Sequence, residues 1–358
     1  MSTIVEKKRA TIHDVAAKAG VTKSTVSQVL AGKGNYPKAT RERIQREAQR
    51  LKYEPDPLAR RLSNGHLNKE IALFTLFLDL HVSTKKLQRI QEMLISMGFE
   101  VPVYACGSGT QTPNAILRSL RQQRPRAIVV NTQGLTSKTL HELELYQEEG
   151  GILVCYDGPT EINCDKVIFD REDNSYQAAR HLLELGHRDI GFCSPGITAR
   201  EPRLKGFCRA LDEFEAPFRE DWLIDTDSPH TLYEHAGNEM ASKYLRLKER
   251  PTALCIGDDY TAVCFAAALE RGGVRVPSDV SIIGHDDSPI AGLGPLPLTT
   301  VTHPAEEIVT RTIEFLNTRL QGYEGPPREV VIGSQLVIRE SSAPPRKYKK
   351  QIHSEKSK

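Results

Sequence analysis

Short apolar runs rich in β-branched residues alternate with longer segments of helical periodicity from Lys69 onward, and this alternation constrains the fold more than any other feature. The apolar runs lie at 71–78, 100–106, 127–132, 151–157, 166–170, 189–194, 222–226, 253–257 and 280–286. The helical segments lie near 84–97, 113–123, 136–149, 174–185, 200–214, 231–248 and 259–271. Buried parallel strands joined by crossover helices produce this pattern. The pattern therefore predicts an α/β core built from doubly wound parallel sheets.

The runs fall into two groups, which predict two subdomains with a ligand cleft between them at the carboxyl ends of the strands. Residues 298–303 and 305–321 add a strand and a helix, and residues 328–340 add one or two closing strands. We place the core at 69–342, with an N-subdomain at about 69–165 and 299–326 and a C-subdomain at about 166–298 and 327–342.

Residues 10–56 read as a separate, all-α unit of three short amphipathic helices. Thr11 is an N-cap with Asp14 in the capping-box position, and Gly20 ends the first helix. Thr22 opens a second helix, which runs to Leu30. Two short helices joined through a glycine-containing turn form a helix-turn-helix. A third helix, roughly 39–52, carries an apolar stripe of Ile44, Ala48 and Leu51.

Residues 57–66 form a linker between the two units. Pro55 and Pro57 end the third helix, and the Asp56-Pro57 pair suits the N-cap and first position of a new one. A helix of about eight residues does not sustain itself in water. We therefore expect a hinge helix that orders only against a partner, most simply DNA.

Charge is distributed unevenly along the chain. Residues 1–65 carry a net charge of +8, residues 346–358 carry +5 and residues 66–345 carry −11, although the total is only +2. A basic head on an acidic body is typical of a nucleic-acid-binding unit joined to a regulatory body. Residues 343–358 contain no leucine heptads, so we expect a basic disordered tail and no tetramer through it.

The seven cysteines form no CxxC pair, and several lie inside apolar runs, where a buried reduced thiol is expected. Their odd number and the absence of a signal peptide predict a cytoplasmic protein. The longest apolar run, 71–80, reaches about half of a membrane span and includes Asp79. We expect no membrane segment.

No pattern predicts a catalytic residue, a metal site or a cofactor. The sequence has no GxGxxG after a strand, no Walker A motif and no GxSxG, and His230 and His235 are five residues apart. An enzyme on a doubly wound core remains the alternative function, because a fold does not determine its function.

TIHDVAAKAGVTKSTVSQVLAGKG (11–34) and PKATRERIQREAQRLKYEPDPLARRL (37–62) resemble the DNA-binding signature of the LacI/GalR transcription regulators. The family's ligand-binding core is resembled by GHRDIGF (186–192), RLKGF (203–207), CIGDDYTAV (255–263), RVPSDVSIIGHDD (275–287) and LTTVTHP (298–304). The resemblance covers roughly residues 10–340 and implies a periplasmic-binding-protein-like type I core. The core motifs alone would also suit periplasmic sugar-binding proteins, but those lack a basic helix-turn-helix head.

The resemblance implies that the second helix enters the major groove. The base-reading positions are Lys23, Ser24 and Gln28, and the backbone-contacting positions are Thr25, Ser27 and Asn35. Lysine can donate to guanine, glutamine can pair with adenine, and serine can contact either. Leu62 stands where the family's hinge leucine wedges between base pairs from the minor groove, although it could be an ordinary core leucine.

The same resemblance places the effector-binding positions at Arg203, Asp286, Asp157 and Asp258. An arginine and several carboxylates can bind the hydroxyl groups of a sugar. Asp258 could instead only cap a helix, and Arg203 could only pair with a carboxylate. The first loop, DLHVS (79–83), has Val82 and Ser83 where family members often carry aromatic residues. A sugar, another small metabolite and loss of response therefore all remain open.

Together these features predict a sequence-specific transcriptional regulator, with a repressor as the favoured form. It is expected to bind a pseudo-palindromic double-stranded DNA operator as a homodimer, because one short helix cannot specify a genomic site. A small-molecule effector in the cleft would control it. Whether the effector releases DNA or promotes binding is left open.

Overall fold

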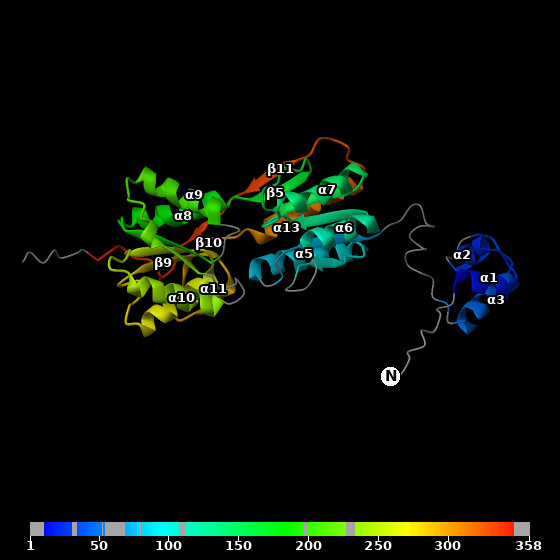
Figure 1. The fold of residues 1–358 in the computed structure, drawn as a ribbon, viewed down its shortest axis with the longest axis horizontal. Coiled ribbons are helices and arrows are strands. Elements are labelled where there is room, and N and C mark those ends of the chain that lie inside the picture. The colour runs from blue at the N-terminus through cyan, green and yellow to red at the C-terminus, as the bar shows by residue number, and fades with distance from the viewer. Residues whose placement is uncertain are drawn as a thin grey trace, which may run out of the picture. The chain divides into compact units, whose positions relative to one another are not determined.

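The computed structural model describes residues 11–30, 34–51, 53, 69–76, 78, 80–106, 112–195, 200–226 and 233–346. The chain divides into two compact units, a head within residues 1–68 and a core within residues 69–358 (Figure 1). Each unit is described by itself. No helix in the described part of the chain is both long enough and apolar enough to cross a membrane.

The head is a three-helix unit, as predicted. Its helices are α1 (Ile12–Ala19), α2 (Lys23–Leu30) and α3 (Lys38–Arg50). The Thr11 backbone N–H donates to Asp14 Oδ2 at 2.8 Å, and the Thr11 hydroxyl accepts from the Asp14 N–H at 3.4 Å, which confirms the capping box. Gly20 ends α1 at φ 60°, a conformation that glycine adopts without strain. The core of the head is formed by Val15, Ala16, Ala19, Val26, Val29, Ile44 and Ala48.

The first sheet of the core has the strand order β11-β5-β4-β3-β1-β2, and all its strand pairs are parallel. Its strands are β1 (Ile71–Thr75), β2 (Val103–Ala105), β3 (Ala127–Asn131), β4 (Ile152–Asp157), β5 (Asp165–Phe169) and β11 (Glu329–Ile332). Its helices are α5 (His81–Ser96), α6 (Pro113–Gln123), α7 (Ser137–Glu148) and α13 (Ala305–Leu320). We call this unit the N-subdomain.

The second sheet has the corresponding order β12-β10-β9-β8-β6-β7, parallel except for β12. Its strands are β6 (Ile190–Pro195), β7 (Leu223–Thr226), β8 (Ala253–Ile256), β9 (Ser281–Asp286), β10 (Thr299–Thr302) and β12 (Leu336–Val337). Its helices are α8 (Arg171–Glu184), α9 (Arg200–Glu213), α10 (Tyr233–Arg246), α11 (Asp259–Arg271) and the short α12 (Pro289–Leu293). We call this unit the C-subdomain.

Helices cover both faces of each sheet, so successive strand residues point into different cores. In β3, Ala127 and Val129 pack with α5 and α13, whereas Ile128 and Val130 pack with α6 and α7. The C-subdomain has the same arrangement, with α10 and α11 on one face and α8 and α9 on the other (Figure 1). Burial on both faces explains why the strands read as continuous apolar runs.

Three strands lie in the sheet opposite to the predicted one. Residues 166–170 were expected in the C-subdomain, but β5 pairs with β4 in the N-subdomain. Residues 299–303 were expected in the N-subdomain, but β10 pairs with β9. β11 was expected in the C-subdomain and pairs with β5. The described chain passes between the sheets after β5, β10 and β11. A short apolar strand has the same sequence pattern in either sheet, so the pattern could not locate these crossings.

The boundary predicted for the disordered tail, at residue 343, lies too early in the chain. Ala343 accepts from His187 Nε2 at 2.9 Å and donates its N–H to Ser281 Oγ at 3.0 Å. The Arg346 guanidinium donates to Asp279 Oδ1 at 2.8 Å. Residues 343–346 are therefore held against the C-subdomain by backbone hydrogen bonds and one ion pair. The polar, basic composition of the tail gives no sign of these contacts. The rest of the tail lies outside the described residues.

Candidate functional site

A cavity of about 80 Å³ lies between the two subdomains, at the carboxyl ends of their strands. It is lined by Leu80, His81, Val82, Ser83, Gln133, Asp157, Arg171, Arg203, Tyr233, Gly257, Asp258, Tyr260, Asp286 and His303. All four predicted effector-binding residues are among them. Arg171 and His303 lie on the connections that follow β5 and β10, where the chain passes between the subdomains. These connections therefore form part of the cavity wall.

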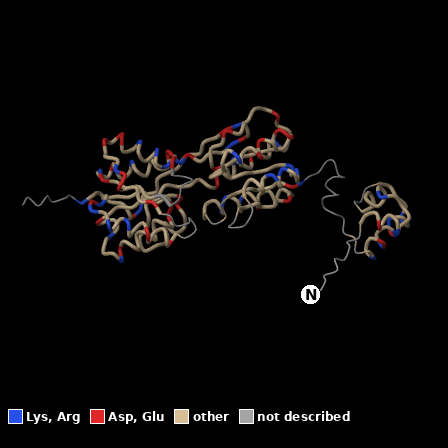
Figure 2. Tube along the Cα trace, viewed as in Figure 1, with Lys and Arg blue, Asp and Glu red and all other residues tan. Residues whose placement is uncertain are grey.

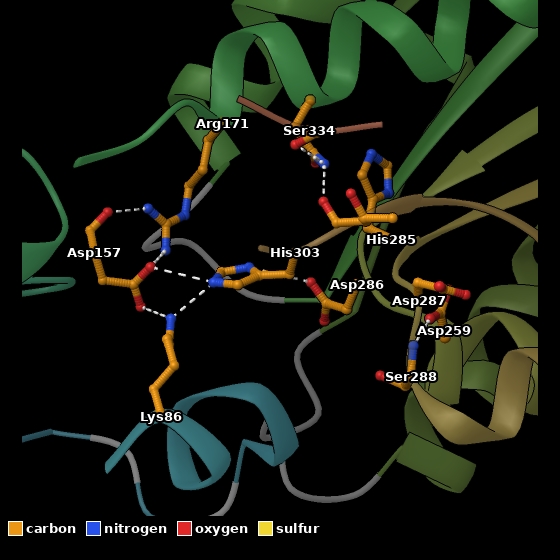
Figure 3. A network of polar contacts seen from close by, with 12 residues as sticks. Lys86, Asp157, Arg171, Asp259, His285, Asp286, Asp287, Ser288, His303 and Ser334 are labelled. Atoms are coloured by element: carbon orange, nitrogen blue, oxygen red, sulfur yellow. Dashed lines mark hydrogen bonds and ion pairs between the residues drawn. The ribbon is translucent and has the colours of Figure 1, made fainter. Parts of the chain in front are cut away.

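Asp157 ends β4 and is completely buried, with a left-handed backbone at φ 78°. The fully buried Lys86 of α5 donates through Nζ to its Oδ2. Arg171, at the start of α8, donates to its backbone oxygen at 2.6 Å and to Oδ1 at 3.2 Å (Figure 3). Burial alone would raise the pKa of Asp157, but Lys86 and Arg171 hold it well below its usual range. Asp157 is therefore an ionised carboxylate whose partners come from both subdomains.

His303 extends this network across the cleft. Its Nε2 lies 2.8 Å from Lys86 Nζ and 3.5 Å from Asp157 Oδ1, and its Nδ1 lies 3.7 Å from Asp286 Oδ1 (Figure 3). Asp286 ends β9, also with a left-handed backbone, at φ 103°. Burial raises the pKa of Asp286, but His303 and Arg203 more than compensate and keep it below its usual value. The polar chain thus runs from α5 of the N-subdomain to β9 of the C-subdomain.

Arg203 of α9 lines the cleft with an incompletely paired guanidinium, as far as the described residues show. Its side chain is 11% exposed, and its Nε is buried without a hydrogen-bond partner among the described residues. Its Nη2 lies 4.0 Å from Asp286 Oδ1, beyond hydrogen-bond distance. A buried guanidinium with unsatisfied donors is costly to fold. The geometry suits a ligand that supplies the missing acceptors.

Two adjacent carboxyl groups open α11, and only the first lines the cavity. Asp258 caps the helix, accepting from the Thr261 N–H at 2.7 Å, and burial raises its pKa to about 6. It therefore both caps the helix and faces the cleft. Asp259 is fully buried beneath, where it accepts from the Ser288 N–H at 2.7 Å and the Thr300 hydroxyl at 2.6 Å. Burial raises the pKa of Asp259 to about 8.

Aromatic rings line the cavity, although Val82 and Ser83 of the first loop do not supply them. Tyr260 stacks on Tyr233 with ring centroids 5.0 Å apart and an interplanar angle of 27°. His81 lies against the same Tyr260 ring at 5.5 Å and 54°. Val82 and Ser83 occupy the wall as predicted, so the rings that they do not supply come from α10 and α11 instead.

Several of these residues were not predicted. The burial of Lys86 could have been predicted, because it lies on the same face of a helix as Ile90 and Leu94, at i+4 and i+8 spacing. Arg171 directly follows an apolar strand, and His303 lies inside the LTTVTHP motif. The two tyrosines begin or nearly begin helices that follow strands, which is where cleft residues of parallel sheets gather.

The head presents the predicted DNA-reading residues on one exposed face of α2. Lys23, Ser24 and Gln28 are exposed, Thr25 and Ser27 are half-buried, and Asn35 is exposed in the loop that follows. The opposite face of α2 buries Val26 and Val29. Leu62 and the predicted hinge lie outside the described residues. The described head carries seven Lys and Arg against three Asp and Glu (Figure 2).

Comparisons with known proteins bear on both units. Residues 11–56 match the bacterial regulatory proteins of the lacI family, and residues 179–342 match the periplasmic binding protein-like domain. The HTH-type transcriptional repressor PurR of Yersinia pestis is 30% identical over 93% of this chain and 97% of that repressor. The chain belongs to the LacI/GalR family. The PurR repressor of Vibrio parahaemolyticus is 28% identical over 92% of this chain and 98% of its own length.

Solved structures of LacI/GalR proteins share the fold. A lac repressor dimer bound to operator and the anti-inducer ONPF aligns with a TM-score of 0.71 at 24% identity, covering 94% of this chain and 100% of that one. The regulator CelR in complex with cellobiose aligns with a TM-score of 0.66 at 24% identity, covering 93% and 100%. Membership of this family makes the protein a DNA-binding transcriptional regulator.

Proposed function

We propose that the protein is a repressor that binds a pseudo-palindromic operator as a homodimer and responds to a small polar effector in its cleft. The main support is helix α2, which Thr22 caps by accepting from the Thr25 N–H at 3.2 Å. This helix buries Val26 and Val29 while leaving Lys23, Ser24 and Gln28 exposed on one face. The relatives named as PurR are repressors, and the lac repressor was solved as a dimer on its operator. Binding to operator DNA would place its action in the cytoplasm.

In this proposal, contacts to DNA divide into two kinds. Lys23, Ser24 and Gln28 would touch base edges in the major groove and carry specificity. Thr25, Ser27 and Asn35 would touch phosphates and hold the register without reading sequence. The resemblance to the family adds Leu62 as a minor-groove wedge. Two copies are needed, because the bases that one short helix reaches are too few to define a site.

The cleft would bind a hydroxylated molecule, with a sugar as one candidate. The Arg203 Nε has no acceptor among the described residues, and Asp286 and Asp258 offer carboxylate oxygens on the same wall. Tyr233 and Tyr260 add aromatic surface to the lining, which suits a ring-shaped ligand. Asp157 has a different role in this scheme. Its carboxylate is fully buried and engaged by Lys86 and Arg171, so it would position these side chains rather than contact the effector.

An effector would control DNA binding through the connections between the two subdomains. His303 and Arg171 lie where the chain passes between subdomains, so a ligand that changes the contacts of Arg203 and Asp286 also changes the network that joins the two sheets. A ligand that prefers one arrangement of the subdomains shifts the population toward it. The size of the shift is limited by its differential affinity for the two arrangements.

The test is selection of binding sites from random DNA with the full-length protein. We expect a palindromic consensus, and a log–log salt dependence whose slope reflects the phosphates neutralised. Gln28→Ala should relax preference at one position of each half-site, whereas Thr25→Ala should weaken binding to all sequences alike. A panel of sugars, nucleosides and amino acids is then added to the same assay. Equal losses on selected and random DNA for Gln28→Ala would show that Gln28 does not read a base.

A further inference from the structure

The side chain of Gln28 has a partner within the head. Its Oε1 accepts a hydrogen bond from the Tyr36 hydroxyl at 2.5 Å. Tyr36 lies in the loop between α2 and α3, and its half-buried ring packs against the core of the head. The hydroxyl is therefore carried by a ring that cannot move freely.

Gly34, in the described end of this loop, allows the Tyr36 ring to approach α2. Gly34 has φ 78°, a backbone conformation that other residues rarely adopt. A Cβ atom added at Gly34 would lie 2.6 Å from Tyr36 Cε2 and 3.2 Å from Gln28 Oε1. Glycine at position 34 thus permits the close approach of Tyr36 to Gln28.

The contact matters because the two ends of a glutamine amide have opposite hydrogen-bonding properties. The oxygen accepts and the amino group donates, so rotating the amide by half a turn exchanges which base atoms it can bind. A phenol hydroxyl that donates to the oxygen selects one of these orientations. It also spares part of the rotamer entropy that a free glutamine side chain loses when it binds.

We propose that Tyr36 is a positioning residue that sets the base preference of Gln28. With Oε1 engaged, the amino group of Gln28 is the end presented to DNA. It would favour bases with an acceptor in the major groove, such as N7 and O6 of guanine, N7 of adenine or O4 of thymine. It would disfavour cytosine, whose N4 amino group only donates. This inference rests on the proposed role of Gln28 as a base reader.

The experiment compares the full-length protein with Tyr36→Phe, Gln28→Ala and the double variant. Affinity is measured for the selected operator and for its single-base variants at the position where Gln28→Ala loses preference. We expect Tyr36→Phe to reduce discrimination against cytosine at that position by about three- to tenfold, within the range of one base contact. Preferences at other positions and the salt slope should not change. In the Gln28→Ala background, Tyr36→Phe should have no further effect on base preference.

Tyr53→Phe is the matched control, because Tyr53 packs against the same core of the head. Tyr53→Phe is expected to affect only the thermal stability and to leave base preference unchanged at every position. Two outcomes would overturn the proposal while leaving Gln28 as a base reader: an unchanged preference in Tyr36→Phe, or an equal loss of affinity for all sequences. If Gln28→Ala changes the base preference at no position, Gln28 does not read a base and the inference about Tyr36 is wrong as well.

If Tyr36→Phe does not fold, Gly34→Ala provides the second variant, because its Cβ displaces the Tyr36 ring. It should show the same loss of discrimination against cytosine.

Discussion

Asp157 and Asp286 end corresponding strands of the two sheets, both with positive φ, and the two ring nitrogens of His303 face one carboxylate each, at 3.5 and 3.7 Å. β4 and β9 hold the same place in the two strand orders. Each carboxylate therefore points from its own sheet into the cleft, and His303 lies between them on the connection that follows β10 (Figure 3). Non-glycine residues at positive φ are costly and tend to occur at functional sites.

Lys86→Met should destabilise the core by about 3 kcal/mol, because it leaves the buried Asp157 carboxylate with less compensation. The loss is measured by urea unfolding, with the single tryptophan, Trp222, as a fluorescent probe. Lys85→Met is the control, since Lys85 is the exposed neighbour of Lys86 and should leave the midpoint unchanged. The double variant Lys86→Met/Asp157→Asn should recover part of the stability, because it removes both charges. Strictly additive losses would mean that the two side chains are not energetically coupled.

Arg203→Met should abolish the response to effector without weakening the empty core. The Arg203 Nε is buried without a hydrogen-bond partner among the described residues, so replacing the guanidinium removes an unsatisfied polar group. This gain offsets the loss of the 4.0 Å ion pair with Asp286, so stability should change little. The measurement is the melting temperature with and without a ligand that stabilises the natural protein. Arg209→Met is the control, because Arg209 lies on the same helix with a side chain 47% exposed. A large loss of stability in Arg203→Met would instead identify Arg203 as a structural partner of Asp286.

Asp259→Asn should flatten the pH dependence of stability between about pH 4 and pH 8. Burial raises the pKa of Asp259 from 3.8 to about 8, so in this window the folded state keeps a proton that the unfolded state has lost. The free energy of unfolding therefore falls as pH rises through the window. Asparagine resembles the protonated carboxyl and is neutral throughout, so the variant should gain on the natural protein as pH rises. Urea midpoints from pH 5 to pH 8.5 test this, with exposed Asp212→Asn as the control. A constant difference across the range would contradict it.

Local features of the fold were predictable because their causes are local. Thr11, Asp14 and Gly20 specify the ends of α1 through hydrogen bonds and backbone preferences within a few residues. The strands and helices of the core followed from periodicity. The assignment of β5, β10 and β11 to sheets was wrong because a short apolar strand has the same sequence pattern in either sheet. The sheet that a strand joins depends on contacts with residues far away in the sequence, and the apolar pattern carries no information on those contacts.

The site was predictable only in part, for a related reason. Arg203, Asp286, Asp157 and Asp258 came from the resemblance to a family, and all four line one cavity, while their roles remain proposals. The partners that give these residues their chemistry lie far away in sequence. Lys86 reaches Asp157 across 71 residues, and His303 reaches Lys86 across 217. A charge pattern along the chain cannot reveal such pairs. The contact between Tyr36 and Gln28 was also missed, because it depends on the path of the loop around Gly34.

Gly206→Ala should be among the most disruptive single changes in the core. A Cβ atom at Gly206 would lie 1.9 Å from the backbone oxygen of Glu172, so α8 and α9 could not keep their present distance. We expect a loss of about 3 kcal/mol, at the upper end for overpacking against backbone. Because α8 begins with Arg171 and α9 carries Arg203, effector binding should weaken as well. Urea unfolding and the ligand-induced melting shift measure the two effects. Gly292→Ala is the control, since no atom lies within 4 Å of its added Cβ. If Gly206→Ala unfolds at the same urea concentration as the natural protein, the two helices can separate without cost and their close contact is not needed to hold Arg171 and Arg203 at the cleft.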